Sequence, residues 1–278
     1  MSLYPTIHSS MSNRYPEVKA FFTSDSPIPK KIKSQEKLEV TAQGVFVLDL
    51  HSGHTLYEKN PHKRLKPASL TKIMTSLVAL DYYKDDTILS VINAYKSVGS
   101  KVDFIKNDQI MAKNALEGLL ISSGNDAAVT LAENYPGGYT AFIKQMNSKA
   151  LNMGLQNTHF SNVSGVESSD HYTSAYDISM IAKAALDRSI FESIVSQKQG
   201  SFKSLKGHTY TFKSTNILLN KPGYFGVKTG WTPEAGECLV ILVDIDNQPL
   251  LVSLLNSKDR FGEAEQIVDW VYKNYIWE

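Results

Sequence analysis

The chain has 278 residues, of which 42% are hydrophobic, and a formal net charge of +1. This length allows one large domain or two subdomains with a substantial core, and the composition is that of a globular protein. The balanced charge argues against a nucleic acid partner, and the single cysteine, Cys238, excludes an internal disulfide. No run of 18 or more apolar residues is present, and no segment has the profile of a signal peptide or anchor.

Residues 1–37 are expected to form a flexible linker or tether, because they contain four prolines, several serines and a cluster of lysines. Folded structure is predicted from residue 38 onward. An apolar strand at 44–50 turns at 51–53 and returns at 54–58 as a hairpin. A helix follows from Pro67 to about Tyr82, since apolar residues recur there at helical spacing.

The middle of the chain, from about residue 86 to 200, is predicted to be mainly helical. Periodic apolar positions place helices at 109–121, 126–133, 139–153 and 175–186. Strands are predicted again near the end of the chain, at 226–231, 237–245 and 250–255, followed by a closing amphipathic helix at 262–275 whose apolar stripe should face the core.

These elements predict an α/β protein of the α+β type. Strands from both ends of the chain would form one antiparallel sheet, beside an inserted helical subdomain. The sheet subdomain is expected at about 38–66 and 205–278, and the helical subdomain at about 67–204. The functional site is expected in a cleft between them.

Three short motifs occur in order along the chain: Ser69-Leu70-Thr71-Lys72, Ser123-Gly124-Asn125 and Lys228-Thr229-Gly230. Each is weak alone, because Ser-x-x-Lys also occurs at Ser34 and Ser-x-Asn also occurs at Ser214. Ser34 falls in the expected linker, whereas each motif of the ordered set falls on a plausible element. The combination is one that serine enzymes reacting with penicillins carry.

The first motif supplies a nucleophile and a base. Positions i and i+3 share one face of a helix, so the Ser69 hydroxyl and the Lys72 amine can meet. A serine needs a base to become nucleophilic, and lysine is a poor base near neutrality because its pKa is about 10.4. Burial and a second nearby cation would lower this pKa, and Lys228 is the expected second cation.

The other motifs suit a carbonyl substrate with a free carboxylate. Ser123 could pass a proton from Lys72 to the leaving amine, and Asn125 would fix Lys72 and a substrate amide. Lys228 and Thr229 would bind the terminal carboxylate, while Gly230 would let the substrate backbone lie close.

The carbonyl oxygen becomes negative during the reaction and needs backbone N–H donors. The N–H groups of Ser69 and Trp231 are the candidates for this oxyanion hole.

With their flanking residues, the motifs resemble the D-alanyl-D-alanine carboxypeptidases, which are low-molecular-mass penicillin-binding proteins. The matching segments are 67–75, 120–128, 171–177 and 228–239. The resemblance covers residues 38–278. It implies a β-lactamase- or transpeptidase-like fold and a serine peptidase that trims the terminal D-alanine from peptidoglycan stem peptides through a Ser69 acyl-enzyme.

The same resemblance implies that β-lactams acylate Ser69 as covalent inhibitors, that no cofactor is needed, and that the enzyme acts outside the cytoplasm. Relatives often hold the substrate carboxylate with a basic residue near the end of the last strand, for which Arg260 and Lys258 are both candidates. Many relatives carry a further β-rich domain and an anchor that this sequence lacks, so any attachment would come from the N-terminal side. Trp231 is bulkier than the residue that relatives often have at its position.

Three alternatives remain open. The enzyme could be an endopeptidase that cuts peptide cross-links. A class A type β-lactamase would need a glutamate to activate the deacylating water, for which Glu167 is the one candidate. A catalytically silent protein that binds muropeptides or β-lactams is the third alternative.

A metal site is not expected, because the seven histidines form no metal-binding motif. His171 is interpreted as making a structural hydrogen bond, and Cys238 as a buried, unreactive thiol.

Overall fold

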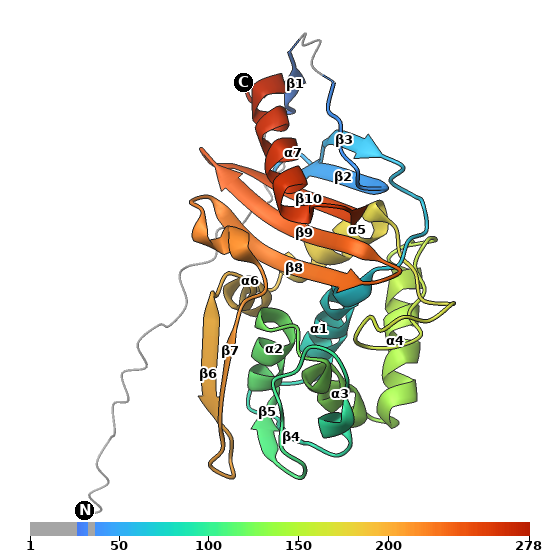
Figure 1. The fold of residues 1–278 in the computed structure, drawn as a ribbon, viewed down its shortest axis with the longest axis vertical. Coiled ribbons are helices and arrows are strands. Elements are labelled where there is room, and N and C mark those ends of the chain that lie inside the picture. Colours follow the sequence, from blue (N-terminus) through green and yellow to red (C-terminus); the bar gives the residue numbers. More distant parts are fainter. Residues whose placement is uncertain (1–26, 33–36) are drawn as a thin grey trace, which may run out of the picture.

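The computed structural model describes residues 27–32 and 37–278, and its centre is a five-stranded antiparallel sheet (Figure 1). Its N-terminal strands are β2 (Gly44–Asp49) and β3 (Thr55–Lys59), and its C-terminal strands are β8 (Tyr224–Thr232), β9 (Gly236–Ile245) and β10 (Gln248–Ser257). The strand order is β3-β2-β10-β9-β8. The prediction of one sheet built from both ends of the chain is confirmed.

Alternating side chains of the sheet enter two separate cores. Along β9, Leu239 and Ile241 belong to the cluster formed with α7 (Arg260–Asn274), whereas Val240 and Leu242 face the helical layer. A strand covered on both faces reads as a continuous apolar run, which is why its position could be predicted. Helix α7 buries Ile267, Val268 and Val271 completely, so its predicted core-facing role is confirmed.

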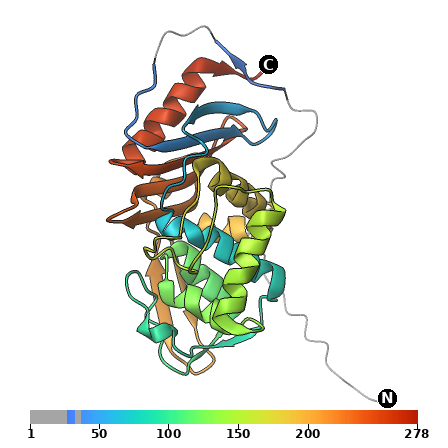
Figure 2. The same ribbon diagram turned by 90° about the vertical axis from the view of Figure 1, so that its right-hand side faces the viewer.

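Six helices lie on the face of the sheet opposite α7 (Figures 1 and 2): α1 (Thr71–Tyr82), α2 (Ala112–Ile121), α3 (Asn125–Glu133), α4 (Gly138–Asn152), α5 (Ala175–Leu186) and α6 (Ser189–Val195). Helix α1 packs against α2, α4 and α5, and α5 also packs on β2 and β10. Three short 3-10 turns are η1 (Ala68–Leu70), η2 (Ala94–Lys96) and η3 (Ile217–Asn220).

The helix predicted at 109–121 begins three residues later than expected. Its first three residues form β5 (Gln109–Met111), which pairs with β4 (Ile88–Ser90). Within β5 only Ile110 is buried, and it lies opposite Leu89. The alternating burial of a strand therefore overrides the helical periodicity until Ala112.

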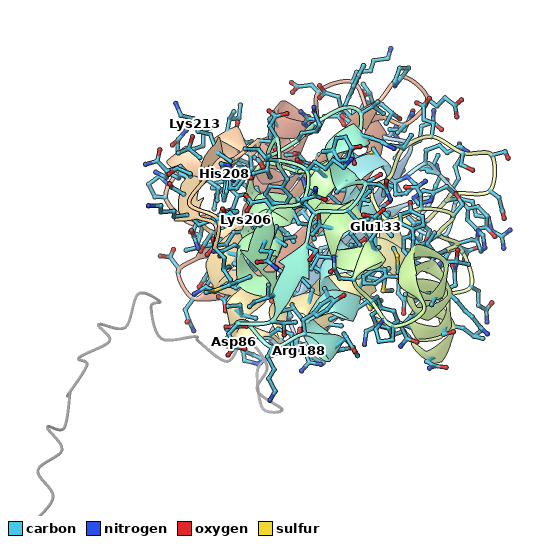
Figure 3. All side chains as sticks on the ribbon, turned by 90° about the horizontal axis from the view of Figure 1, so that it is seen from below. Asp86, Glu133, Arg188, Lys206, His208 and Lys213 are labelled. Carbon is cyan, nitrogen blue, oxygen red and sulfur yellow. The ribbon has the colours of Figure 1, made fainter. Side chains whose placement is uncertain are left out.

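A hairpin that the sequence did not predict lies beside the helices. Strands β6 (Gln199–Lys203) and β7 (Thr209–Lys213) pair with each other, outside the five-stranded sheet, and pack on α2. Lys206, His208 and Lys213 lie along this hairpin in Figure 3. The hairpin spans residue 205, where the sheet subdomain was expected to resume, and so places β7 on the helical side.

Part of the expected linker is paired. Strand β1 (Lys30–Lys31) is antiparallel to β11 (Tyr275–Ile276), directly after α7. The remainder of that expectation, residues 1–26 and 33–36 with Ser34, lies outside the described residues. In the described part of the chain, no helix has the length and apolar character needed to cross a membrane.

Candidate active site

Ser69 and Lys72 meet at the start of α1. Ser69 lies in the 3-10 turn η1, immediately before α1 rather than within its first turn. The Lys72 Nζ atom is 2.8 Å from Ser69 Oγ, as the i, i+3 spacing predicts. The same amine donates to the carbonyl oxygen of Ser164 at 2.8 Å. The amine is thus fixed between the hydroxyl and a backbone acceptor.

Burial makes Lys72 a usable base. Its side chain is fully enclosed, and this desolvation lowers its pKa well below the ordinary value. The charge of Lys228 lowers the pKa further, while Asp126 opposes both effects. A neutral amine beside the hydroxyl can accept the serine proton.

Strand β8 brings the second amine to the same place. Lys228 is 1% exposed, and β8 packs against η1. Burial, followed by the charge of Arg260, lowers the pKa of Lys228 to about 7. Its Nζ donates to the carbonyl oxygen of Thr229 at 3.1 Å. The arrangement is the one that the sequence predicts for a second cation near Lys72.

The third motif runs directly past the backbone of the nucleophile. A Cβ on Gly230 would lie 3.0 Å from the nitrogen of Ser69, so a side chain here would crowd that N–H. Thr229 shares a hydrogen bond of 2.6 Å with Thr215 through their hydroxyls. Trp231, the residue of β8 after Gly230, is 60% exposed.

Ser123 lies in the turn between α2 and α3, and Asn125 is the first residue of α3. Ser123 has a left-handed backbone (φ 64°), and its buried hydroxyl has no partner in the described part of the chain. The Asn125 side-chain NH2 donates to the carbonyl of Val98 at 2.6 Å, and in the described part of the chain Asn125 makes no hydrogen bond to Lys72, which it was expected to fix. Its Oδ1 is also buried without a partner among the described residues. Unpaired buried polar atoms are costly, so these two are suited to a substrate that would pair them.

The structure separates the two candidate carboxylate-binding residues. Arg260, at the start of α7, donates through Nη1 to the carbonyl of Gly230 at 2.9 Å. Lys258 is exposed, and its backbone N–H bonds to the Thr41 hydroxyl. Arg260 is therefore the basic residue beside the third motif.

Several residues at the site carried no sequence signal. Ser164 and Gly165 lie in an irregular loop, and a Cβ on Gly165 (φ 86°) would be 1.8 Å from the carbonyl oxygen of Ala68. Thr215 lies inside the second Ser-x-Asn copy, which was set aside. In that copy the Ser214 hydroxyl accepts from the Asn216 N–H, as in an ordinary turn. Neither segment has the periodicity that reveals helices and strands.

The structure also gives the surroundings of three residues outside the three motifs, His171, Cys238 and Glu167. His171 is 1% exposed and lies 2.7 Å from the Thr71 hydroxyl, consistent with a structural hydrogen bond. Cys238 is fully buried, and burial raises its pKa to about 12. Glu167 accepts a hydrogen bond from the Glu234 N–H at the β8–β9 turn. Within residues 27–32 and 37–278, no three His, Cys, Asp or Glu side chains are grouped to hold a metal.

Comparison with known proteins places this chain in a family. A family model described as D-alanyl-D-alanine carboxypeptidase matches residues 30–259. The D-alanyl-D-alanine carboxypeptidase DacF of Bacillus subtilis is 32% identical over 253 residues, covering 87% of this chain and 65% of that protein. A D-alanyl-D-alanine endopeptidase of Pseudomonas aeruginosa is 33% identical over 255 residues, covering 88% of this chain and 80% of that protein.

The fold is matched by a solved structure as well. The crystal structure of the DD-transpeptidase of Streptomyces strain K15 superposes with a TM-score of 0.81 and 32% identity, covering 86% of this chain and 99% of that one. The chain spans slightly less than two thirds of the length of the Bacillus relative. The family model, the relatives and the fold agree, and the chain belongs to the D-alanyl-D-alanine carboxypeptidase family.

Proposed function

We propose that the protein is a serine D-Ala-D-Ala carboxypeptidase that removes the terminal D-alanine from peptidoglycan stem peptides. The observation that carries the proposal is the 2.8 Å contact between the buried Lys72 amine and the Ser69 hydroxyl, with Lys228 close enough to lower the pKa of that amine. Such an enzyme acts where peptidoglycan lies, outside the cytoplasm.

In the acylation step, neutral Lys72 takes the proton of Ser69, whose oxygen attacks the carbonyl of the penultimate D-alanine. The N–H groups of Ser69 and Trp231 stabilise the negative oxygen of the tetrahedral intermediate. Ser123 then passes a proton from Lys72 to the departing amine. Water hydrolyses the ester and restores the free serine.

Binding of the substrate uses the remaining motif residues. The carboxylate of the leaving D-alanine pairs with Thr229, Lys228 and Arg260, since charge-assisted hydrogen bonds orient a carboxylate strongly. Asn125 bonds the peptide amide on the other side of the scissile bond. A β-lactam presents a similar carbonyl and carboxylate, so it acylates the same serine.

The contacts of Glu167 favour a peptidase over a class A type β-lactamase. Its carboxylate is engaged by the β8–β9 turn through the Glu234 N–H and the Thr232 side chain. A deacylating glutamate must instead hold a water against the acyl-enzyme ester. Long-lived acylation by penicillin is therefore expected.

The decisive experiment combines adduct mapping with product analysis. The protein is incubated with a penicillin, and the modified peptide is identified by mass spectrometry, with Ser69→Ala as the control. A stem pentapeptide is then assayed for free D-alanine, and a cross-linked dimer peptide for cleavage. An adduct on Ser69 with D-alanine release supports the proposal. Cleavage of the cross-linked dimer without release of D-alanine would indicate an endopeptidase. Rapid and complete turnover of penicillin would indicate a β-lactamase. An unmodified Ser69 would indicate a silent binding protein.

A further inference from the structure

The residue before the nucleophile has an unusual backbone conformation. Ala68 has φ 47°, in the left-handed region that residues other than glycine rarely adopt. A residue persists there only when its surroundings hold it. Two contacts do so: the backbone of Gly165 lies against the Ala68 carbonyl, and the Thr71 hydroxyl bonds to the same oxygen at 2.8 Å.

The direction of each hydrogen bond around Thr71 is fixed by chemistry. The carbonyl oxygen of Ala68 can only accept, so the single proton of the Thr71 hydroxyl points to it. The hydroxyl oxygen must then accept from His171 Nε2, 2.7 Å away. On the far side of the ring, the Ser161 backbone N–H donates to His171 Nδ1 at 3.0 Å.

These constraints leave one protonation state for His171. Nδ1 accepts and must be bare, and Nε2 donates and must carry the proton, so the ring is neutral. Burial agrees with this state, because it is the main cause that lowers the pKa of His171 to about 3, with smaller contributions from the charges of Lys66 and His159.

The chain of bonds ends on the peptide group that contains the Ser69 N–H. The Ala68 carbonyl and the Ser69 N–H belong to one planar unit and point in opposite directions. A hydrogen bond that fixes the carbonyl therefore also fixes the direction of the N–H. It also polarises the unit, because hydrogen bonds at the two ends of a peptide group strengthen each other.

We propose that His171 is a positioning residue that acts through Thr71 and the Ala68 carbonyl to aim and polarise the Ser69 N–H as an oxyanion donor. The inference rests on the proposed acyl-enzyme chemistry at Ser69. It gives His171 a role in the rate of acylation beyond holding a loop in place.

The same ring also fixes the opposite wall of the site. The segment from Ser161 to Gly165, which bonds to the ring at Ser161, carries the Ser164 carbonyl that accepts from Lys72. Within it, the Asn162 side chain accepts from the backbone N–H groups of Ser164 and Gly165. The neutral His171 ring thus connects the segment that carries the Ser164 carbonyl, which accepts from Lys72, with the peptide group between Ala68 and Ser69.

The test compares Thr71→Val with Thr71→Ser. Valine has nearly the same shape but no hydroxyl, so acylation by penicillin should fall about 10- to 100-fold, somewhat less than for complete loss of an oxyanion donor. Serine keeps the hydroxyl and should restore acylation to within about threefold of the unaltered protein. For a stem peptide, kcat and kcat/KM should fall together, because the bond gains strength only in the transition state.

A spectroscopic readout separates positioning from general stability. The ester carbonyl of the penicilloyl enzyme, measured by infrared difference spectroscopy, should shift to higher wavenumber in Thr71→Val, because its oxygen loses a well-aimed donor. Ser76→Ala is the matched control. It also removes a buried hydroxyl of α1, but that hydroxyl bonds within the helix, to the Ile73 carbonyl at 2.7 Å. Its acylation rate and carbonyl frequency should stay near those of the unaltered protein.

A second pair of variants, His171→Gln and His171→Asn, tests His171 directly. This pair tests the proposal even if Thr71→Val does not fold. In His171→Gln an amide N–H can still reach Thr71, whereas His171→Asn is too short. Faster acylation and a lower carbonyl frequency in the Gln variant support the proposal. The proposal would be overturned if His171→Gln and His171→Asn had equal acylation rates and equal carbonyl frequencies. It would also be overturned if Thr71→Val matched the unaltered protein in both measurements. An unaltered protein that penicillin does not acylate at Ser69 would instead refute the proposed function.

Discussion

The buried amines of Lys72 and Lys228 are electrostatically linked. Burial is the main cause that lowers the pKa of Lys72, and the charge of Lys228 lowers it further. Burial, followed by the charge of Arg260, lowers the pKa of Lys228 to about 7. Because two cations in one buried site repel each other, a change at Lys228 should alter the protonation of Lys72.

Replacement of Lys228 by Gln should move the pH dependence of acylation. Without the second cation, the pKa of Lys72 rises, although burial still keeps it below its ordinary value. Because the neutral amine is the base, the rising limb of the acylation rate should shift to higher pH, by about one unit or more. Penicillin acylation rates between pH 5 and 10 measure the shift. Lys206→Gln removes an equal charge on the β6–β7 hairpin and should leave the profile in place; an unchanged profile in the Lys228 variant would contradict the link.

The pKa of Lys228 also predicts a change of stability with pH. The folded state releases this proton at about pH 7, and the unfolded chain releases it near its ordinary value of about 10.4. Between these values the unfolded state binds more protons, so the free energy of unfolding rises with pH, by up to about 1.4 kcal/mol per unit.

Urea denaturation at pH 7, 8 and 9 measures this effect as a difference between the unaltered protein and Lys228→Met. From pH 7 to pH 9, the free energy of unfolding of the unaltered protein should rise by about 2–3 kcal/mol relative to that of Lys228→Met. The exposed hairpin variant Lys206→Met should show a constant difference. A constant difference for Lys228→Met as well would mean that the buried amine keeps its proton throughout.

Arg260 and Lys258 offer a matched pair for the carboxylate site. Arg260→Gln should lower kcat/KM for a stem peptide about 10- to 100-fold, since a charge-assisted hydrogen bond contributes about 1.5–3 kcal/mol. Lys258→Gln, with the same loss of charge at an exposed position, should change kcat/KM less than twofold. A substrate ending in an amide instead of a carboxylate should reduce the difference between the Arg260 variant and the unaltered protein. Equal losses in both variants would show that net charge alone matters.

Gly165→Ala should disrupt the site through the backbone. The new Cβ would lie 1.8 Å from the Ala68 carbonyl oxygen, so one of the two segments must move. We expect a loss of about 3 kcal/mol or more in the free energy of unfolding and a strong loss of Ser69 acylation. Gly154→Ala is the control, since Gly154 has a similar φ of 73° but open space around its Cβ position. It should cost about 1 kcal/mol and leave acylation intact.

The sequence predicted local elements well where burial leaves a periodic pattern. The apolar runs of β2, β9 and β10 and the stripe of α7 are visible because whole faces of these elements are covered. The start of α2 and the β6–β7 hairpin were missed. In β5, Ile110 fits both a helical and a strand pattern, and in the hairpin the buried Phe202, Tyr210 and Phe212 alternate with polar residues over only two short strands.

The sequence by itself determined the motif residues and their order, because the chemistry of a serine nucleophile restricts which residue types can surround it. Only the tertiary structure decided which segments meet them. The approach of Gly165 to Ala68, the bond of Arg260 rather than Lys258 to Gly230, and the His171–Thr71 contact join segments far apart in the chain. Such contacts depend on how loops close over a packed core, and a loop without periodicity records little of its partners in its own residues.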